Sequence, residues 1–184
     1  MKELNWVKEL NEAYKKNILL KEENMTPLPL WASRVDMSNP RHRAAKDIHN
    51  AWMQRNPRGD WNKHQHVPYE DLSDEEQEKD GVHVDTIMDI SKGIIADSPE
   101  DHRHLSADAF GAKAHEAWRK GFDSEGTGKA RMKKVSDGSE VNINVPWEEL
   151  HPEWKKENYE AGLAAYDAMS KHFKEDRSAE DYRD

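Results

Sequence analysis

Histidine is the residue type in this chain best suited to metal or proton chemistry, and there are ten of them. His64 and His66 form one H-x-H pair, and His102 and His104 form another. Alternate residues on a strand can present two rings to one metal. The chain has no cysteine and no H-E-x-x-H motif, and both pairs stand in polar connecting segments, which favours surface or capping histidines. We therefore expect no metal site and no cofactor.

Nucleophilic and phosphate-loop chemistry find no complete motif. The stretch GTGK at 126–129 fails the phosphate-loop pattern because Asp123 occupies the first glycine position and Ala130 the hydroxyl position. No serine stands in a nucleophile-elbow or S-x-x-K context, and the abundant carboxylates single out no acid and base pair. We expect the protein not to be an enzyme.

A basic cluster follows the GTGK stretch. Its members are Lys129, Arg131, Lys133 and Lys134. We favour a solvated strand face for this cluster, with contact to an anion as the alternative.

Tryptophan and arginine provide a second kind of candidate site. Trp31 and Trp61 lie in irregular polar stretches beside Arg34, Arg55 and Arg58. Planar rings next to guanidinium groups suit stacking on a base and pairing with phosphate, although ring edges packed over a loop would give the same pattern. The predicted lining of a binding pocket is Trp31, Arg34, Trp52, Arg55, Trp61, His66, Tyr69 and Trp118.

The composition limits what can position these residues. The 184 residues are 35% hydrophobic and 35% charged, so the core must be small, and seven tryptophans supply much of it. A net charge of −9 disfavours binding to the nucleic-acid backbone. Without cysteine there is no disulfide framework, and the charged N-terminal stretch has no apolar run of signal-peptide or membrane-span type. We expect a soluble, cytoplasmic protein that does not bind membranes.

The chain aligns with itself at two anchors. At an offset of 66, His49, Ala51 and Trp52 match His115, Ala117 and Trp118. At an offset of 78, Val67, Pro68, Glu70 and Leu72 match Val145, Pro146, Glu148 and Leu150. The second copy therefore carries twelve extra residues between its anchors.

Both anchors predict defined local structure. Around each histidine, apolar and small residues recur at helical spacing, and we favour a hydrogen bond inside the core for His49 and His115 over contact with a ligand. The proline of the second anchor brings the chain in extended. A helix is then expected to begin, at the Ser73–Glu76 capping box in the first copy and at His151-Pro152 in the second.

Three further elements are expected. The twelve extra residues fall in a region with two alternating runs around Asp137-Gly138, which predicts a small β-hairpin. Residues 4–20 carry apolar side chains at i, i+4 spacing, which predicts an amphipathic helix. Residues 174–184 have the composition of a frayed acidic tail.

The pattern of a helical tryptophan, a turn tryptophan, then proline, an aromatic residue, leucine and an acidic helix resembles the ryanodine receptor repeat, or RyR domain. In the first copy these positions are Trp52, Trp61, Pro68, Tyr69, Leu72, Glu76 and Asp80, while Gln77 replaces the lysine of the family. The second copy keeps Trp118, Pro146, Leu150 and Lys155 but departs at Trp147, Trp154 and Asn158. The second copy also lacks the turn tryptophan.

The resemblance implies a mainly α fold with a small β-hairpin, in which two tandem repeats are related by a pseudo-twofold axis. It implies residues 1–34 as N-terminal helix and linker, 35–97 as the first repeat, 98–173 as the second repeat with the hairpin, and 174–184 as the tail. Stand-alone members of this family occur in bacteria and bacteriophages. The resemblance brings no catalytic machinery with it.

Two functions remain open at this point. The first is a non-catalytic pocket for a small anionic, nucleotide-like ligand, which in a phage protein would sequester a defence signal of the ADP-ribose type. The second is a protein–protein interaction module without a small-molecule ligand, in which the N-terminal helix drives self-association or binds a partner.

Overall fold

The computed structural model describes residues 35–180, with side chains described to Phe173. The expected N-terminal helix, Trp31 and Arg34 lie outside the described residues. The chain divides into two compact units, Met1–Asp36 and Met37–Asp184, and all the elements below belong to the second unit.

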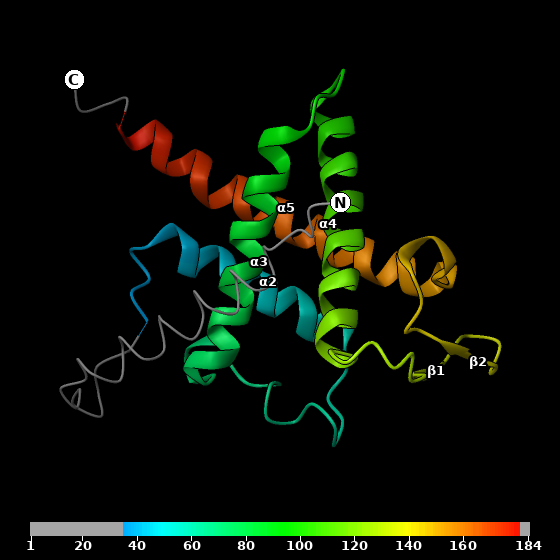
Figure 1. Cartoon of the computed structure of the whole chain (residues 1–184). Helices are drawn as coiled ribbons and strands as arrows, with labels where there is room; N and C mark the ends of the chain where they lie inside the picture. Colours follow the sequence, from blue (N-terminus) through cyan, green and yellow to red (C-terminus); the bar gives the residue numbers. More distant parts are fainter. Residues whose placement is uncertain (1–34, 181–184) are drawn as a thin grey trace. The chain divides into compact units, whose positions relative to one another are not determined.

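The described residues are mainly helical and include one small antiparallel sheet, as the sequence predicts (Figure 1). The α-helices are α2 (Pro40–Arg55), α3 (Asp74–Gly93), α4 (Pro99–Phe122) and α5 (Pro152–Glu180). Two short 3-10 turns, η1 (Tyr69–Asp71) and η2 (Trp147–Glu149), precede α3 and α5. The strands are β1 (Met132–Lys134) and β2 (Glu140–Asn142).

Side-chain caps set the helix starts. Asn39, Ser73 and Ser98 each accept a backbone N–H of the first helical turn, at α2, α3 and α4 respectively. At α5, Nδ1 of His151 accepts from the Glu153 N–H at 3.3 Å. Both helix starts predicted from the sequence, after Ser73 and at Pro152, are therefore confirmed.

Helix α5 packs against all three of the other described α-helices, as α3 also does. It contacts α2, α3 and α4, while α3 and α4 also contact each other and α2 contacts α3 (Figure 1). The residues buried between them are mostly small or aliphatic, and they include Ala45, Ile87, Phe110 and Ala165. Small side chains let helix axes approach closely.

Helices α4 and α5 come so close where they cross that glycine is required at the contact. A Cβ on Gly162 would lie 2.3 Å from the carbonyl oxygen of Ala107, so no larger residue fits there without movement of the backbone. On the other helix, a Cβ on Gly111 would lie 3.1 Å from the backbone of Asn158. This crossing fixes Asn158 relative to α4.

The hairpin forms at the expected Asp137-Gly138 turn. Lys133 pairs with Val141 in the antiparallel register, and Gly138 has φ 85°, a left-handed conformation that favours glycine. Helix α5 continues to Glu180. Residues 174–180, expected as part of a frayed tail, are therefore helical. No helix within residues 35–180 is both long and apolar enough to cross a bilayer.

Candidate functional site

The two anchor histidines make the same hydrogen bond in both copies. Nε2 of His49 lies 2.8 Å from the carbonyl oxygen of Val67, and Nε2 of His115 lies 2.8 Å from that of Val145. Both histidines are buried. The predicted hydrogen bonding inside the core is confirmed for both.

The rings around these histidines are also arranged alike. His49 stacks on Trp52 with ring centroids 6.0 Å apart, and His115 stacks on Trp118 at 5.9 Å. His49 is tilted against Tyr69 at 54°, and His115 is tilted against the residue in the matching position, Trp147, at 53°.

The proline-led segments have matching backbones. Pro68 has φ −51° and ψ 145°, and Pro146 has φ −53° and ψ 153°. Each is followed by a 3-10 turn that the next leucine, Leu72 or Leu150, closes with an N–H bond of 3.2 Å. Gln77 and Lys155, which match at the offset of 78, both donate to carbonyls of this turn: Gln77 to Tyr69 at 3.0 Å, and Lys155 to Glu148 at 3.0 Å.

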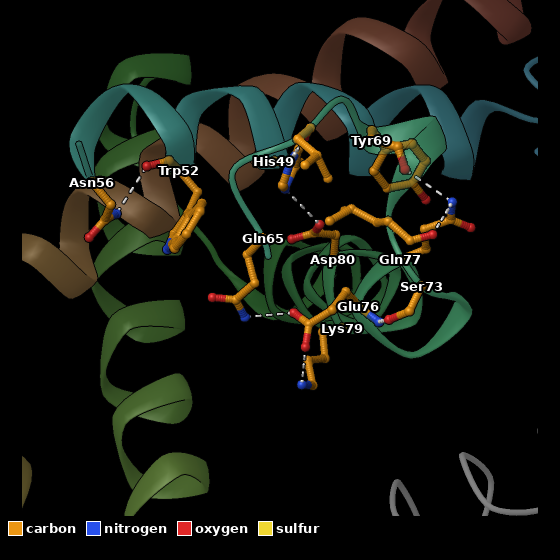
Figure 2. Close-up of polar contacts among 12 residues, drawn as sticks. His49, Trp52, Asn56, Gln65, Tyr69, Ser73, Glu76, Gln77, Lys79 and Asp80 are labelled. Carbon is orange, nitrogen blue, oxygen red and sulfur yellow. Dashed lines mark hydrogen bonds and ion pairs between the residues drawn. The ribbon is translucent and has the colours of Figure 1, made fainter. Parts of the chain in front are cut away.

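In the first copy two half-buried carboxylates, those of Asp80 and Glu76, lie beside His49 and Gln65 (Figure 2). Oδ2 of Asp80 lies 3.5 Å from Nδ1 of His49, and the Glu76 carboxylate accepts from Gln65 at 2.8 Å and from Lys79 at 2.7 Å. Burial lowers the pKa of His49, but the bonds to Asp80 and Val67 outweigh burial and raise this pKa overall.

The second copy differs at both carboxylate positions. At the offset of 78, Trp154 stands where the first copy has Glu76, and Asn158 stands where it has Asp80. The amide nitrogen of Asn158 donates to the Trp154 carbonyl at 2.8 Å. His115 and Asn158 line the same cavity, so the residue that matches Asp80 there is a neutral amide rather than a carboxylate.

A cavity of about 370 Å³ opens at this place. Residues from α4, the hairpin and α5 line it, together with two from the first copy. The lining consists of Asn56, Trp61, His115, Trp118, Arg131, Lys133, Ile143, Leu150, Trp154 and Asn158. This volume lies in the lower part of the range of small-molecule sites.

The lining is basic although the chain is acidic. It includes Arg131 and Lys133 but no carboxylate. Within the described residues no Asp or Glu lies at ion-pair distance from either cation, while Nζ of Lys133 lies 6.0 Å from the ring centre of Trp154. An unpaired arginine beside indole rings is suited to an anionic group on a planar ligand.

Asp123 anchors the loop that leads to the hairpin. Its carboxylate accepts from the N–H and hydroxyl of Thr127, each at 2.8 Å, and from the N–H of Gly128 at 2.6 Å. These hydrogen bonds, together with one from Asn144 at 3.3 Å, lower the pKa of Asp123 to about 2. The anchor lies at the C-cap of α4 and so connects the hairpin cations to the helix that carries His115.

The predicted lining is brought together in part. Trp61 and Trp118 line the cavity from the two copies. Trp52 meets Trp61 edge to face at 6.3 Å, and Nε2 of His66 lies 3.1 Å from the carbonyl oxygen of Asn56. These two residues therefore contact the lining without being part of it.

Tyr69 and Arg55 lie elsewhere. Tyr69 is buried in the core, with its hydroxyl 3.1 Å from Nδ1 of His42. Nε of Arg55 lies 3.8 Å from a carboxylate oxygen of Glu157.

Sequence reasoning missed most of the second copy's contribution. For Arg131 and Lys133 the sequence favours a solvated strand face, with contact to an anion as the alternative, and Trp154 is absent from the predicted lining. The internal alignment carried a usable signal, because it pairs Trp154 with Glu76 and Asn158 with Asp80. The second copy has no negative charge at these two positions, so an anionic group is not repelled there.

The two histidines of the second H-x-H pair make different contacts. His102 lies 2.9 Å from both the Ser91 carbonyl and the Tyr166 hydroxyl, whereas His104 stacks on Tyr159. In the described part of the chain no three His, Asp or Glu residues are grouped so as to hold a metal ion.

No protein-family model, curated protein or solved structure matches this chain.

Proposed function

We propose that the protein binds a small anionic, nucleotide-like ligand in the cavity between His115, the hairpin and α5, without catalysing a reaction on it. The observation that supports this most strongly is the lining itself. Three tryptophans and two unpaired cations meet there with no carboxylate, in a chain of net charge −9.

The cavity offers a partner for each part of such a ligand. Trp61, Trp118 and Trp154 provide apolar faces for a planar ring. Arg131 and Lys133 extend from the hairpin and would bind phosphate oxygens, arginine with two donors in a fixed geometry. Asn56 offers an amide for the polar edge of a ring.

The same proposal treats the two copies as tandem RyR-like repeats. The repeated histidine bonds, ring pairs and proline turns support this relation. Because Asn56 and Trp61 come from the first copy and the other lining residues from the second, the cavity lies where two repeats meet. A duplicated module thereby gains a binding site that neither copy forms alone.

Titration of the purified protein tests this function. Tryptophan fluorescence and thermal unfolding are followed with adenosine, ADP, ADP-ribose, cyclic ADP-ribose and inorganic pyrophosphate. We expect saturable quenching and stabilisation by the phosphorylated ligands, about 2.7 kcal/mol at a hundredfold excess over Kd. Trp154→Phe should weaken binding, whereas Trp147→Phe, which alters a ring outside the cavity, should not. If none of these compounds gives a saturable change, the proposed function is wrong.

One observation favours the interaction module as a second candidate. Ile95 is 95% exposed and Leu105 is 48% exposed, both near the connection between α3 and α4. Exposed aliphatic side chains that lie together are typical of contact surfaces. Measuring the mass in solution of the wild type and of Ile95→Ser with Leu105→Ser tests self-association; an unchanged monomer mass in both argues against it.

A further inference from the structure

We propose that an acidic group of the ligand occupies, in the second copy, the position that the Asp80 carboxylate takes in the first, and that it contacts Nδ1 of His115. Asn158 is then the residue that admits anions to the cavity. This inference rests on the proposed function and specifies that His115 and Asn158 recognise the negative charge of the ligand.

The first copy shows the occupied version of this arrangement. Nε2 of His49 is held by the Val67 carbonyl at 2.8 Å, which leaves Nδ1 for Asp80 at 3.5 Å (Figure 2). The imidazole bridges a neutral oxygen and a charged one. A carboxylate at that distance favours the protonated ring.

The second copy keeps the contact between the imidazole and a carbonyl oxygen but, within residues 35–173, has no carboxylate at the other ring nitrogen. Nε2 of His115 is held by the Val145 carbonyl at 2.8 Å, and His115 is only 4% exposed. Among the described residues no hydrogen-bond partner of Nδ1 of His115 is found. The cavity, rather than a carboxylate, borders this ring, and Asn158 is part of its lining.

The hydrogen bond to Val145 decides which nitrogen of the neutral ring carries the proton. A carbonyl oxygen only accepts, so Nε2 must donate. In a neutral ring Nδ1 is then a lone-pair acceptor, which repels an anion. An anionic group therefore binds Nδ1 only when the ring takes up a proton, so binding of the ligand and protonation of His115 are coupled.

Few other charges act on this ring. Of the groups that line the cavity with His115, only Arg131 and Lys133 are charged, and both belong to the hairpin. The α5 residues at the cavity, Trp154 and Asn158, are neutral, as are Asn56 and Trp61 from the first copy. Glu116, next to His115 on α4, is engaged by Arg119 at 2.9 Å and by the Trp147 N–H at 3.1 Å.

The same comparison predicts one ligand per chain. In the first copy Asp80 already occupies Nδ1 of His49, and Glu76 with Gln65 fills the place of Trp154. A second anion would meet two carboxylates there. Repulsion between like charges excludes it.

The test exchanges the two residues that differ between the copies. Asn158→Asp places a carboxylate of nearly the same size in the cavity, and Asp80→Asn is the matched control in the first copy. Binding of ADP-ribose and of adenosine is measured by calorimetry near neutral pH, in two buffers of different ionisation enthalpy. The diphosphate bridge of ADP-ribose has no group that titrates near neutral pH, so any proton uptake belongs to the protein.

We expect the wild type to bind one ADP-ribose per chain with net proton uptake. Asn158→Asp should weaken ADP-ribose at least about tenfold and abolish the uptake, because its own carboxylate competes for Nδ1. Adenosine affinity should change less than about twofold, since adenosine has no acidic group to be repelled. Asp80→Asn should leave ADP-ribose affinity unchanged within about twofold. The first copy already folds around such a His–Asp pair, and the far-UV spectrum and the adenosine titration report folding of the variant.

The outcomes separate the two claims. If the wild type binds ADP-ribose but Asn158→Asp binds it equally well, or if no protons are taken up, the role of His115 and Asn158 is overturned and the proposed function stands. If the wild type binds none of the phosphorylated ligands, the proposed function falls, and this inference with it.

Discussion

Nε2 of His115 lies 2.8 Å from the carbonyl oxygen of Val145, and this contact ties the second half of α4 to the residue before Pro146. The carbonyl belongs to a segment with no regular partner of its own. The His115 imidazole therefore satisfies this carbonyl in place of the N–H of a neighbouring strand, and the His49 imidazole does the same for Val67 in the first copy.

Removing this imidazole should destabilise the fold. His115→Ala leaves the Val145 carbonyl without its partner, which costs about 1–3 kcal/mol of unfolding free energy. His49→Ala should cost more, because Asp80 also loses its partner. Urea denaturation measures both. His64→Ala, at an exposed position, is the control and should stay within about 0.5 kcal/mol of the wild type.

The His49–Asp80 pair should make stability depend on pH. The folded state raises the pKa of His49, so the pair contributes fully below the pKa of the unfolded chain and loses its contribution as pH rises through the folded pKa. Asp80→Asn should therefore lower the free energy of unfolding by about 1–3 kcal/mol at pH 5.5. At pH 8 the loss should be smaller. Urea midpoints at the two pH values measure this, with Asp89→Asn at an exposed ion pair as control. An equal cost of Asp80→Asn at both values would contradict the role of His49.

The hairpin cations should be distinguishable from their neighbour. Arg131→Ala and Lys133→Ala should each weaken a phosphorylated ligand about tenfold, and the remaining affinity should depend less on salt. Lys134→Ala removes the same kind of charge from the same strand, but outside the cavity lining. Titrations at low and high salt compare the three variants. Equal losses in all three would mean that only the general charge of the hairpin matters.

The α4–α5 crossing should not tolerate a methyl group. Gly162→Ala places Cβ 2.3 Å from the Ala107 carbonyl oxygen and should cost about 1–3 kcal/mol through backbone displacement. Gly121→Ala, also in a helix but with nothing within 4 Å, should be neutral or stabilise by about 0.5–1 kcal/mol. Thermal or urea unfolding of both variants measures the difference. Similar stabilities would show that the helices can separate at little cost.

The Asp123 anchor should affect the site from outside it. Asp123→Ala frees the loop before β1, and we expect ligand affinity to fall about threefold to tenfold because ordering the hairpin then has to accompany binding. Hydrogen exchange of the Thr127 and Gly128 amides should become faster. Glu125→Ala, at an exposed position of the same loop, should change neither quantity. Unchanged exchange in Asp123→Ala would contradict an anchoring role.

Local signals in the sequence predicted the elements well. Asp137-Gly138 specified the turn of the hairpin, and the Ser73 cap and Pro152 specified where α3 and α5 begin, because each of these depends on residues close in sequence. The Ser73–Glu76 box is formed on the serine side, whereas the Glu76 carboxylate accepts from Gln65 and Lys79.

The site was harder to predict because it depends on what lies opposite each residue. Arg131 and Lys133 alternate along one face of the hairpin, and the strand pattern alone does not show that Trp154 stands across from this face. Trp61 and Trp118, both aromatic residues of the repeat pattern, line the cavity. Tyr69 belongs to the same pattern, yet it is buried in the core.

The position of α5 bears on how the chain is made. It contacts α2, α3 and α4, and it is the last of these helices to leave the ribosome. Until it emerges, α3 can already contact α2 and α4, but the faces of these three helices that α5 covers stay exposed to chaperones and to neighbouring chains. Synthesis of this protein should therefore be more prone to aggregation than refolding of the finished chain.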